Sequence, residues 1–203
     1  HAVAVKDEEI ERLARKGTMG AYCPATAVKL AKGATKIGKY PEMMAAGVMM
    51  GLGTDGVSAG GNLNLMRQIY LCAGMFKDCR MDSTLVGAQK ALRMATIEGA
   101  KLLGWDDEIG SLERGKKADF VLFDLDHFEW APYGDPLQAV VYSASPASIA
   151  ETWVDGRPLY RGGRGVTVDE PALRAEARRR AAAVVKRAGL SMAHTPTVTT
   201  TYD

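Results

Sequence analysis

Asp55 is the residue of this chain whose position most needs a chemical explanation. It follows the apolar segment 48–52 and precedes a glycine-rich loop, within the stretch VMMGLGTDGVSAGGN at 48–62. A carboxylate in apolar surroundings is costly unless it accepts hydrogen bonds, pairs with a cation or binds a metal ion. Two interpretations are open at this point: a functional carboxylate at the end of a buried strand, or an aspartate that caps the following turn.

The elements that must position Asp55 alternate between strand and helix. Residues 1–5 are β-prone, DEEIERLARKG predicts a helix that ends at Gly17, and TMGAYCP predicts a strand that ends at Pro24. Pro41 opens a short helix, and the continuously apolar run at 48–52 is typical of a strand buried on both faces. This order predicts parallel strands joined by helical crossovers, and therefore an α/β fold.

Two helices are predicted after Asp55. The segment DSTLVGAQKALRMATIEGAKLLG predicts one long helix, with Asp82 or Ser83 as its cap and Gly104 as its end. The segment before it, NLNLMRQIYLCAGMF, predicts a helix from apolar residues at helical spacing. The side chains expected to face the core are those of Leu63, Met66, Ile69, Tyr70 and Ala73.

The last third of the chain changes character. FVLFDL predicts a strand, and Asp155-Gly156 is the dipeptide favoured in type I′ turns, so it predicts a hairpin. Residues 169–188 predict a basic amphipathic helix, whose RRR run fits a solvated face better than a site for an anionic partner. Its core-facing residues are expected to be Leu173, Ala177, Ala181 and Val184.

Composition excludes several functional classes. The chain has 26 basic and 24 acidic residues, a net charge of +2, which argues against a nucleic-acid-binding domain. No apolar run approaches the roughly 20 residues of a membrane helix, and no secretory signal is visible. Cys23, Cys72 and Cys79 match no metal-binding pattern, which favours a reduced, cytoplasmic compartment.

Several motifs together resemble the metal-dependent amidohydrolases, in the branch that contains deaminases and chlorotriazine hydrolases. HAVAVKDEEIERLARKG is similar to the family's sixth barrel strand and helix, AYCPATAVKLAKG to its strand-seven segment, and GLGTDG to its strand-eight signature. ALRMATIEGAKLLGWDDEIGSLERGKKADFVLFDLD resembles the link from the barrel to a small β-sandwich, and WVDGRPLYRGG resembles the closing hairpin of that sandwich. The resemblance covers residues 1–165, and the last two motifs are its most specific part.

The resemblance implies an architecture. Residues 1–107 correspond to the C-terminal part of a (β/α)8 TIM-type barrel, residues 108–168 to part of the small β-sandwich, and residues 169–203 to a C-terminal helix and tail. Such barrels place their chemistry at the carboxyl ends of the strands, where Asp55 falls.

The resemblance also implies roles for five residues. Asp55 matches the aspartate that binds the metal and takes a proton from the attacking water. His1 matches the strand-six histidine that orients water or substrate and contacts the metal in some members. Ser58 and Asn62, in the loop after Asp55, are candidate substrate contacts, and so is Tyr22, which stands where many members carry histidine.

The implied cofactor is a divalent metal, with zinc expected and iron as the alternative. The implied substrate is a small aromatic heterocycle of the purine, pyrimidine or triazine class, which is attacked by water and loses ammonia, an amine or a halide. The implied enzyme class is a hydrolase of carbon–nitrogen bonds other than peptide bonds.

The rest of the family's ligand set is absent from this sequence. The chain has three histidines, and none forms the family's first-strand His-x-His pair or its fifth-strand histidine with the glutamate that follows. A zinc site uses three or four protein ligands, so these 203 residues hold an incomplete site. The chain also opens at His1 without a methionine, which points to a natural start further upstream or to an excised piece.

Two hypotheses are therefore open. The chain is either the C-terminal portion of a working hydrolase, or a non-catalytic fragment or degenerate homologue with a structural or assembly role. A partial barrel leaves an open strand edge and an exposed apolar face, which promote association. We therefore expect the chain to pair with the missing N-terminal half or to self-associate.

Overall fold

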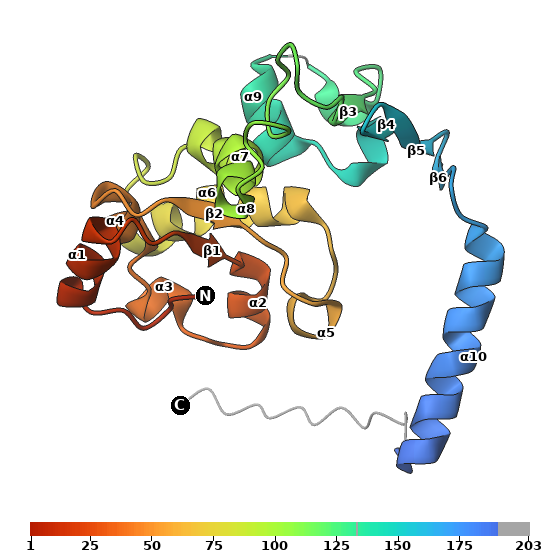
Figure 1. Cartoon of the computed structure of the whole chain (residues 1–203), viewed down its shortest axis with the longest axis horizontal. Coiled ribbons are helices and arrows are strands. Elements are labelled where there is room, and N and C mark those ends of the chain that lie inside the picture. The colour runs from red at the N-terminus through yellow and green to blue at the C-terminus, as the bar shows by residue number, and fades with distance from the viewer. Residues whose placement is uncertain (133, 191–203) are drawn as a thin grey trace.

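The computed structural model describes residues 1–132 and 134–190, and it has an α/β fold. A helix-rich body surrounds two short parallel strands, an antiparallel sheet lies on one side of that body, and a long helix projects away from it (Figure 1). The tail expected at residues 191–203 lies outside the described residues.

The two parallel strands are the ones predicted from the apolar runs. β1 (Gly20–Tyr22) pairs with β2 (Met50–Leu52), with Gly20 opposite Met50. The helix predicted before β1 is present as α1 (Asp7–Arg15). The connection between the strands is formed by α2 (Pro24–Lys29), α3 (Ala34–Ile37) and α4 (Tyr40–Ala45).

The strand expected at residues 1–5 does not form, so that prediction was wrong. A strand requires a hydrogen-bonded neighbour, and among the residues described here β1 pairs with β2 alone. Residues 1–5 instead run as irregular backbone that leads from His1 into α1. Their β-prone composition had no strand in the described chain to pair with.

Helix α6 (Leu65–Arg80) covers most of the segment NLNLMRQIYLCAGMF and confirms the helix predicted there. It follows the single turn α5 (Val57–Gly60), which comes directly after the Asp55 loop. Of the side chains expected in the core, Ile69 and Ala73 are buried, whereas Leu63 and Tyr70 are exposed. The apolar stripe is therefore split between the core and the surface.

The single long helix expected after α6 is two helices, α7 (Ala88–Ala95) and α8 (Ile97–Leu103). Thr96 breaks the helix, with φ −123° and ψ −105°, and Gly104 ends α8 as predicted, with φ +68°. The break turns Gly99 of α8 against β2, where a Cβ on Gly51 would lie 3.2 Å from the Gly99 Cα.

The expected caps Asp82 and Ser83 do not start α7. The Asp82 carboxylate instead accepts from the Thr84 amide at 2.8 Å in a local turn, and α7 begins six residues after Asp82, at Ala88. Aspartate competes for nearby backbone amides in turns as readily as at helix starts, so the residue type alone did not decide between them.

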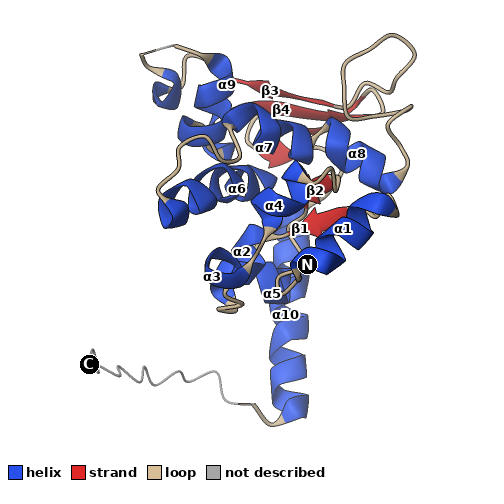
Figure 2. Cartoon of the chain, turned by 90° about the vertical axis from the view of Figure 1, so that its left-hand side faces the viewer, coloured by secondary structure: helices blue, strands red, loops and turns tan. Residues whose placement is uncertain are grey.

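The antiparallel sheet contains β3 (Phe120–Phe123), β4 (Ile149–Val154), β5 (Arg157–Arg161) and β6 (Arg164–Gly165), in that order. The hairpin at Asp155-Gly156 is confirmed, and both residues have positive φ, +51° and +69°, as a type I′ turn requires. Figure 2 shows this sheet above α7 and α8, which separate it from β1 and β2. The segments between β3 and β4 are η1 (Phe128–Trp130), α9 (Pro136–Gln138), η2 (Ala139–Ser143) and η3 (Pro146–Ser148).

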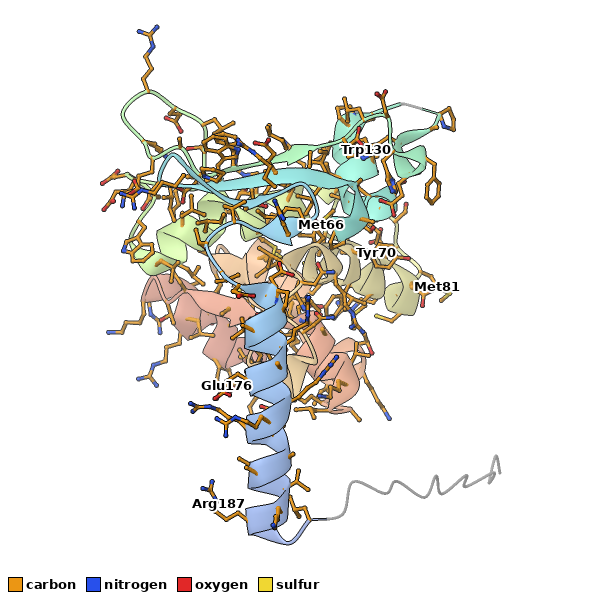
Figure 3. The ribbon with its side chains drawn as sticks, turned by 90° about the vertical axis from the view of Figure 1, so that its right-hand side faces the viewer. Met66, Tyr70, Met81, Trp130, Glu176 and Arg187 are labelled. Carbon is orange, nitrogen blue, oxygen red and sulfur yellow. The ribbon has the colours of Figure 1, made fainter. Side chains whose placement is uncertain are left out.

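Helix α10 (Glu170–Ala188) confirms the predicted C-terminal helix but contradicts its predicted core-facing stripe. None of its residues is buried, and Leu173 and Val184 are 58% and 50% exposed. Figure 3 shows α10 extending beyond the body, with the Glu176 and Arg187 side chains in open surroundings. The apolar stripe failed as a predictor of burial because no described element lies opposite it.

Candidate functional site at the end of β2

The site is centred on Asp55, three residues beyond the end of β2. The Asp55 backbone has φ +58°, in the left-handed region that aspartate tolerates better than most residues. One carboxylate oxygen, Oδ1, accepts a hydrogen bond from the Gly56 amide at 2.7 Å. This bond fixes the orientation of the carboxylate and leaves its second oxygen, Oδ2, available to another group.

His1 supplies that group. Its Nε2 lies 2.9 Å from Asp55 Oδ2, although the two residues are 54 positions apart in the sequence. The two side chains are 33% and 29% exposed, so the pair lies at the surface of the described chain. The His1 carbonyl accepts a hydrogen bond from the Tyr40 hydroxyl at 2.5 Å, which ties the first residue of the chain to α4.

Cys23 borders the pair from the end of β1. Its side chain is buried, and a Cβ on Gly53 would lie 3.1 Å from its sulfur. Burial raises the pKa of the Cys23 thiol, and the negative charge of Asp55 raises it further. Cys23 is therefore a neutral, packed neighbour of the carboxylate at neutral pH.

The three predicted substrate contacts lie in different surroundings. Ser58 and Asn62 are exposed, Ser58 in α5 and Asn62 just after it, where the Asn62 side chain accepts from the Asn64 amide at 3.2 Å. Tyr22 is 1% exposed and stacks on Tyr40, with ring centroids 4.0 Å apart. Burial raises the pKa of its hydroxyl. The substrate roles of these three residues remain predictions.

The residues that support the pair were not predicted from the sequence. The Tyr40 hydroxyl and the Gly56 amide hold His1 and Asp55, respectively, and Lys29 donates to the Ser58 carbonyl at 2.7 Å. The Asp-Gly pair in GTDG was a usable signal for the Gly56 contact. No spacing or motif indicated Tyr40 or Lys29.

The donor atoms of His1 and Asp55 fit one side of a metal site. An imidazole nitrogen and a carboxylate oxygen are both common zinc ligands. Across residues 1–132 and 134–190, no group of three or more His, Cys, Asp and Glu side chains is placed to hold a metal ion. The pair therefore offers two donors, and a full zinc site needs at least one more protein ligand from elsewhere.

Comparison with known proteins decides the family. The model of the amidohydrolase family matches residues 1–159. The chain belongs to the amidohydrolase family. A 5-methylthioadenosine/S-adenosylhomocysteine deaminase of Symbiobacterium thermophilum is 40% identical over 187 residues, which are 92% of this chain and 42% of the relative. The corresponding protein of Acetivibrio thermocellus is 38% identical over 84% of this chain and 39% of its own length.

Solved structures of related enzymes agree with this assignment. An adenosine deaminase of Xanthomonas campestris with bound zinc superimposes with a TM-score of 0.79 at 31% identity, over 88% of this chain and 40% of that one. An atrazine chlorohydrolase of Arthrobacter aurescens, complexed with zinc, gives a TM-score of 0.80 at 27% identity, over 88% of this chain and 39% of that one. This amidohydrolase-family chain thus spans about two fifths of the length of its relatives.

Proposed function

We propose that this chain is the C-terminal portion of a metal-dependent hydrolase of carbon–nitrogen bonds, and that Asp55 and His1 are its contribution to the catalytic site. One observation carries the proposal. In a chain of the amidohydrolase family, His1 Nε2 and Asp55 Oδ2 meet at 2.9 Å beyond the carboxyl end of a parallel strand. Barrel enzymes carry their catalytic residues at the carboxyl ends of their strands, which is where Asp55 lies.

The proposed role of Asp55 is proton transfer. The Gly56 amide holds Oδ1, and Oδ2 faces His1 Nε2. An ionised carboxylate there accepts a proton from the attacking water and passes it to the leaving group. His1 orients the water or the substrate through Nε2, and the Tyr40 hydroxyl fixes its backbone.

The proposed cofactor is a divalent metal held in part by Asp55 and His1, zinc in first place and iron as the alternative. Support comes from the donor atoms of the pair and from the two related structures that contain zinc. Such an ion, when bound, lowers the pKa of its water and so supplies a nucleophile at neutral pH. The remaining ligands come from outside these residues.

We propose that β1 and β2 are strands of a (β/α)8 barrel and that β3 to β6 are part of a small β-sandwich. The boundaries remain 1–107, 108–168 and 169–203. The length of the relatives and the unpaired outer edges of β1 and β2, as the described residues show them, support a missing N-terminal part. That part completes the barrel, or else the chain self-associates.

The proposed location is the cytoplasm, and the free cysteines support it. Separately, every helix within 1–132 and 134–190 is too short or too polar to cross a bilayer.

The proposed reaction is hydrolytic deamination of an aromatic heterocycle of the purine class. Support comes from the relatives named as deaminases, which are 38–40% identical to this chain in the two cases above. Dechlorination of a triazine is the second candidate. Its support is the superposition on the atrazine chlorohydrolase.

A chimaeric enzyme tests this proposal. In the Symbiobacterium thermophilum deaminase, the part that aligns with this chain is replaced by residues 1–203, and the product is assayed with 5-methylthioadenosine and with atrazine in the presence of zinc. We expect release of ammonia from the nucleoside, because the chimaera restores the ligands that this chain lacks. The variant Asp55→Asn keeps the size of the side chain and removes the base, so its kcat is expected to fall by at least about 100-fold.

Asp124→Asn is the matched control. Asp124 directly follows a strand, β3, and its carboxylate also accepts from a backbone amide, that of Asp126, at 3.0 Å. We expect this variant to keep full activity. A folded, zinc-loaded chimaera without activity, or an active Asp55→Asn variant, contradicts the proposal and favours the non-catalytic alternative, a fragment with a structural or assembly role.

A further inference from the structure

Gln68 is a buried polar residue whose side chain spans two elements that are distant in the sequence. It lies in α6 and is 0% exposed, and its Oε1 accepts a hydrogen bond from the Ala25 amide at 2.9 Å. An amide N–H can be accepted only by the oxygen of the Gln68 side chain, so the orientation of that side chain is fixed. Its Nε2 has no hydrogen-bond partner among the residues that the structure describes.

The bond caps a helix that has no cap of its own. Ala25 is the second residue of α2, and the residue before that helix, Cys23, makes no side-chain capping bond. The first amides of a helix lack intrahelical acceptors and need partners from elsewhere when they are buried. Gln68 supplies one from another helix, so the start of α2 is anchored to α6.

The start of α2 in turn supports the loop that carries Asp55. A Cβ on Gly53 would lie 3.1 Å from the Cys23 sulfur, and a Cβ on Gly60 would lie 3.2 Å from the Thr26 hydroxyl. Gly53 and Gly60 stand before and after Asp55, so α2 packs against both ends of the loop. At both places the space between the loop and α2 is too small for a methyl group, so α2 has little room to shift toward the loop without moving it.

We propose that Gln68 is a positioning residue for the catalytic carboxylate. Through the Ala25 amide it holds Cys23 and Thr26 at the two ends of the loop 53–60, and this holds Asp55 within reach of His1. Gln68 is set in a rigid part of the molecule, because its neighbours Ile69 and Cys72 on α6 are buried in the core. The catalytic consequence rests on the function proposed above, but the structural link does not.

Hydrogen exchange in the 203-residue chain tests the link. Gln68→Met keeps the length of the side chain and removes the acceptor. We expect exchange of the Ala25 amide to accelerate by about tenfold or more, and exchange of the Gly53 and Gly60 amides to accelerate with it. Those two amides donate to the Tyr22 and Gly56 carbonyls, so they report on the two ends of the Asp55 loop.

Gln68→Glu is the conservative rescue. Burial keeps a glutamic acid neutral at this position, and its carbonyl oxygen still accepts from Ala25. We therefore expect exchange close to that of the unmodified chain. Cys72→Ala is the matched control, because Cys72 lies one turn further along α6, is 1% exposed, and its thiol lies 3.9 Å from the Met94 sulfur in α7. It is expected to lower stability without selective exchange at Gly53 and Gly60.

The chimaeric enzyme provides the catalytic readout. Gln68→Met is expected to lower kcat by about tenfold or more with little change in KM, since misplacing a catalytic group acts on the chemical step. If Gln68→Met does not fold, Gln68→Asn withdraws the acceptor by one methylene and is measured in the same way.

Faster exchange at Ala25 with unchanged exchange at Gly53 and Gly60 would overturn the proposal, because Gln68 would then cap α2 alone. Equal effects of Gln68→Met and Cys72→Ala at the two glycines would overturn it as well. An inactive chimaera refutes the proposed function, while the exchange measurements still decide the role of Gln68.

Discussion

Helices α6 and α10 begin and end in the same way but lie in opposite surroundings. They have 16 and 19 residues, each starts at a side chain that accepts from a backbone amide, Asn64 and Asp169, and each ends at a left-handed residue, Met81 and Gly189. Yet α6 buries five residues and α10 buries none. Local signals therefore place both helices, and they carry no information about what lies opposite.

The two helices must be stabilised differently. The buried side of α6 faces the main core, where Phe76 packs against Tyr22 and Tyr40. Helix α10 is held by its own ion pairs, from Glu170 to Arg174 and from Glu176 to two arginines, and by its alanines, which favour helix. Such pairs contribute only a few tenths of a kcal/mol each, about 0.2–0.5.

Truncating one large side chain in each helix gives the largest contrast. Phe76 is 1% exposed, so Phe76→Ala leaves a cavity and is expected to lower the free energy of unfolding by about 3–5 kcal/mol. Leu173 is 58% exposed, so Leu173→Ala is expected to change it by less than about 0.5 kcal/mol. Urea unfolding of the two variants measures both values. A large loss in Leu173→Ala would show that α10 is covered in solution.

Sequence patterns predicted where helices and strands lie better than what they contact. The Asp155-Gly156 hairpin, β1 and β2 followed from turn chemistry and apolar runs, which are local properties. The failures share a physical cause. The break at Thr96 depends on the packing of α8 against Gly51. Burial of the apolar stripe of α10 would require another element opposite it, and a local sequence pattern does not show whether one is there.

The candidate site divides in the same way. Asp55 was predicted from the motif GTDG, and His1 from its match to a family strand. Their contact at 2.9 Å depends on the chain path between them, which spacing alone did not give. Gln68 was hidden because a glutamine inside an amphipathic helix has no signature, and its role is visible only from the Ala25 amide, 43 residues away.

Glycine substitutions in the two helices give a smaller contrast. Ala73→Gly in α6 is expected to lower the free energy of unfolding by about 1 kcal/mol from helix propensity, with a further loss from the methyl removed from the core, because Ala73 is fully buried. Ala181→Gly carries the same propensity cost in α10 but is expected to raise local fraying and leave global unfolding unchanged. Hydrogen exchange separates these outcomes. Parallel loss of protection in both helices after Ala181→Gly would mean that they unfold as one unit.

Acid gives the smallest effect and should act on α10 first. Hydrogen bonds from Arg179 and Arg180 lower the pKa of Glu176, and a bond from the Gly165 amide lowers that of Glu170. A lowered pKa in the folded state means that the ionised form stabilises the helix above the ordinary value of 4.5, and that this contribution is lost as pH falls through the lower, folded pKa.

The five buried residues of α6 include no carboxyl group, so its buried face has no equivalent dependence on acid. Carbon chemical shifts recorded from pH 6 to pH 3 are therefore expected to show α10 losing helix while α6 keeps it. Glu176→Gln removes the titrating group, so its α10 should be less helical at pH 6 and change less on acidification. Loss of both helices at one pH would contradict this independence and place α10 within the cooperative unit formed by the core.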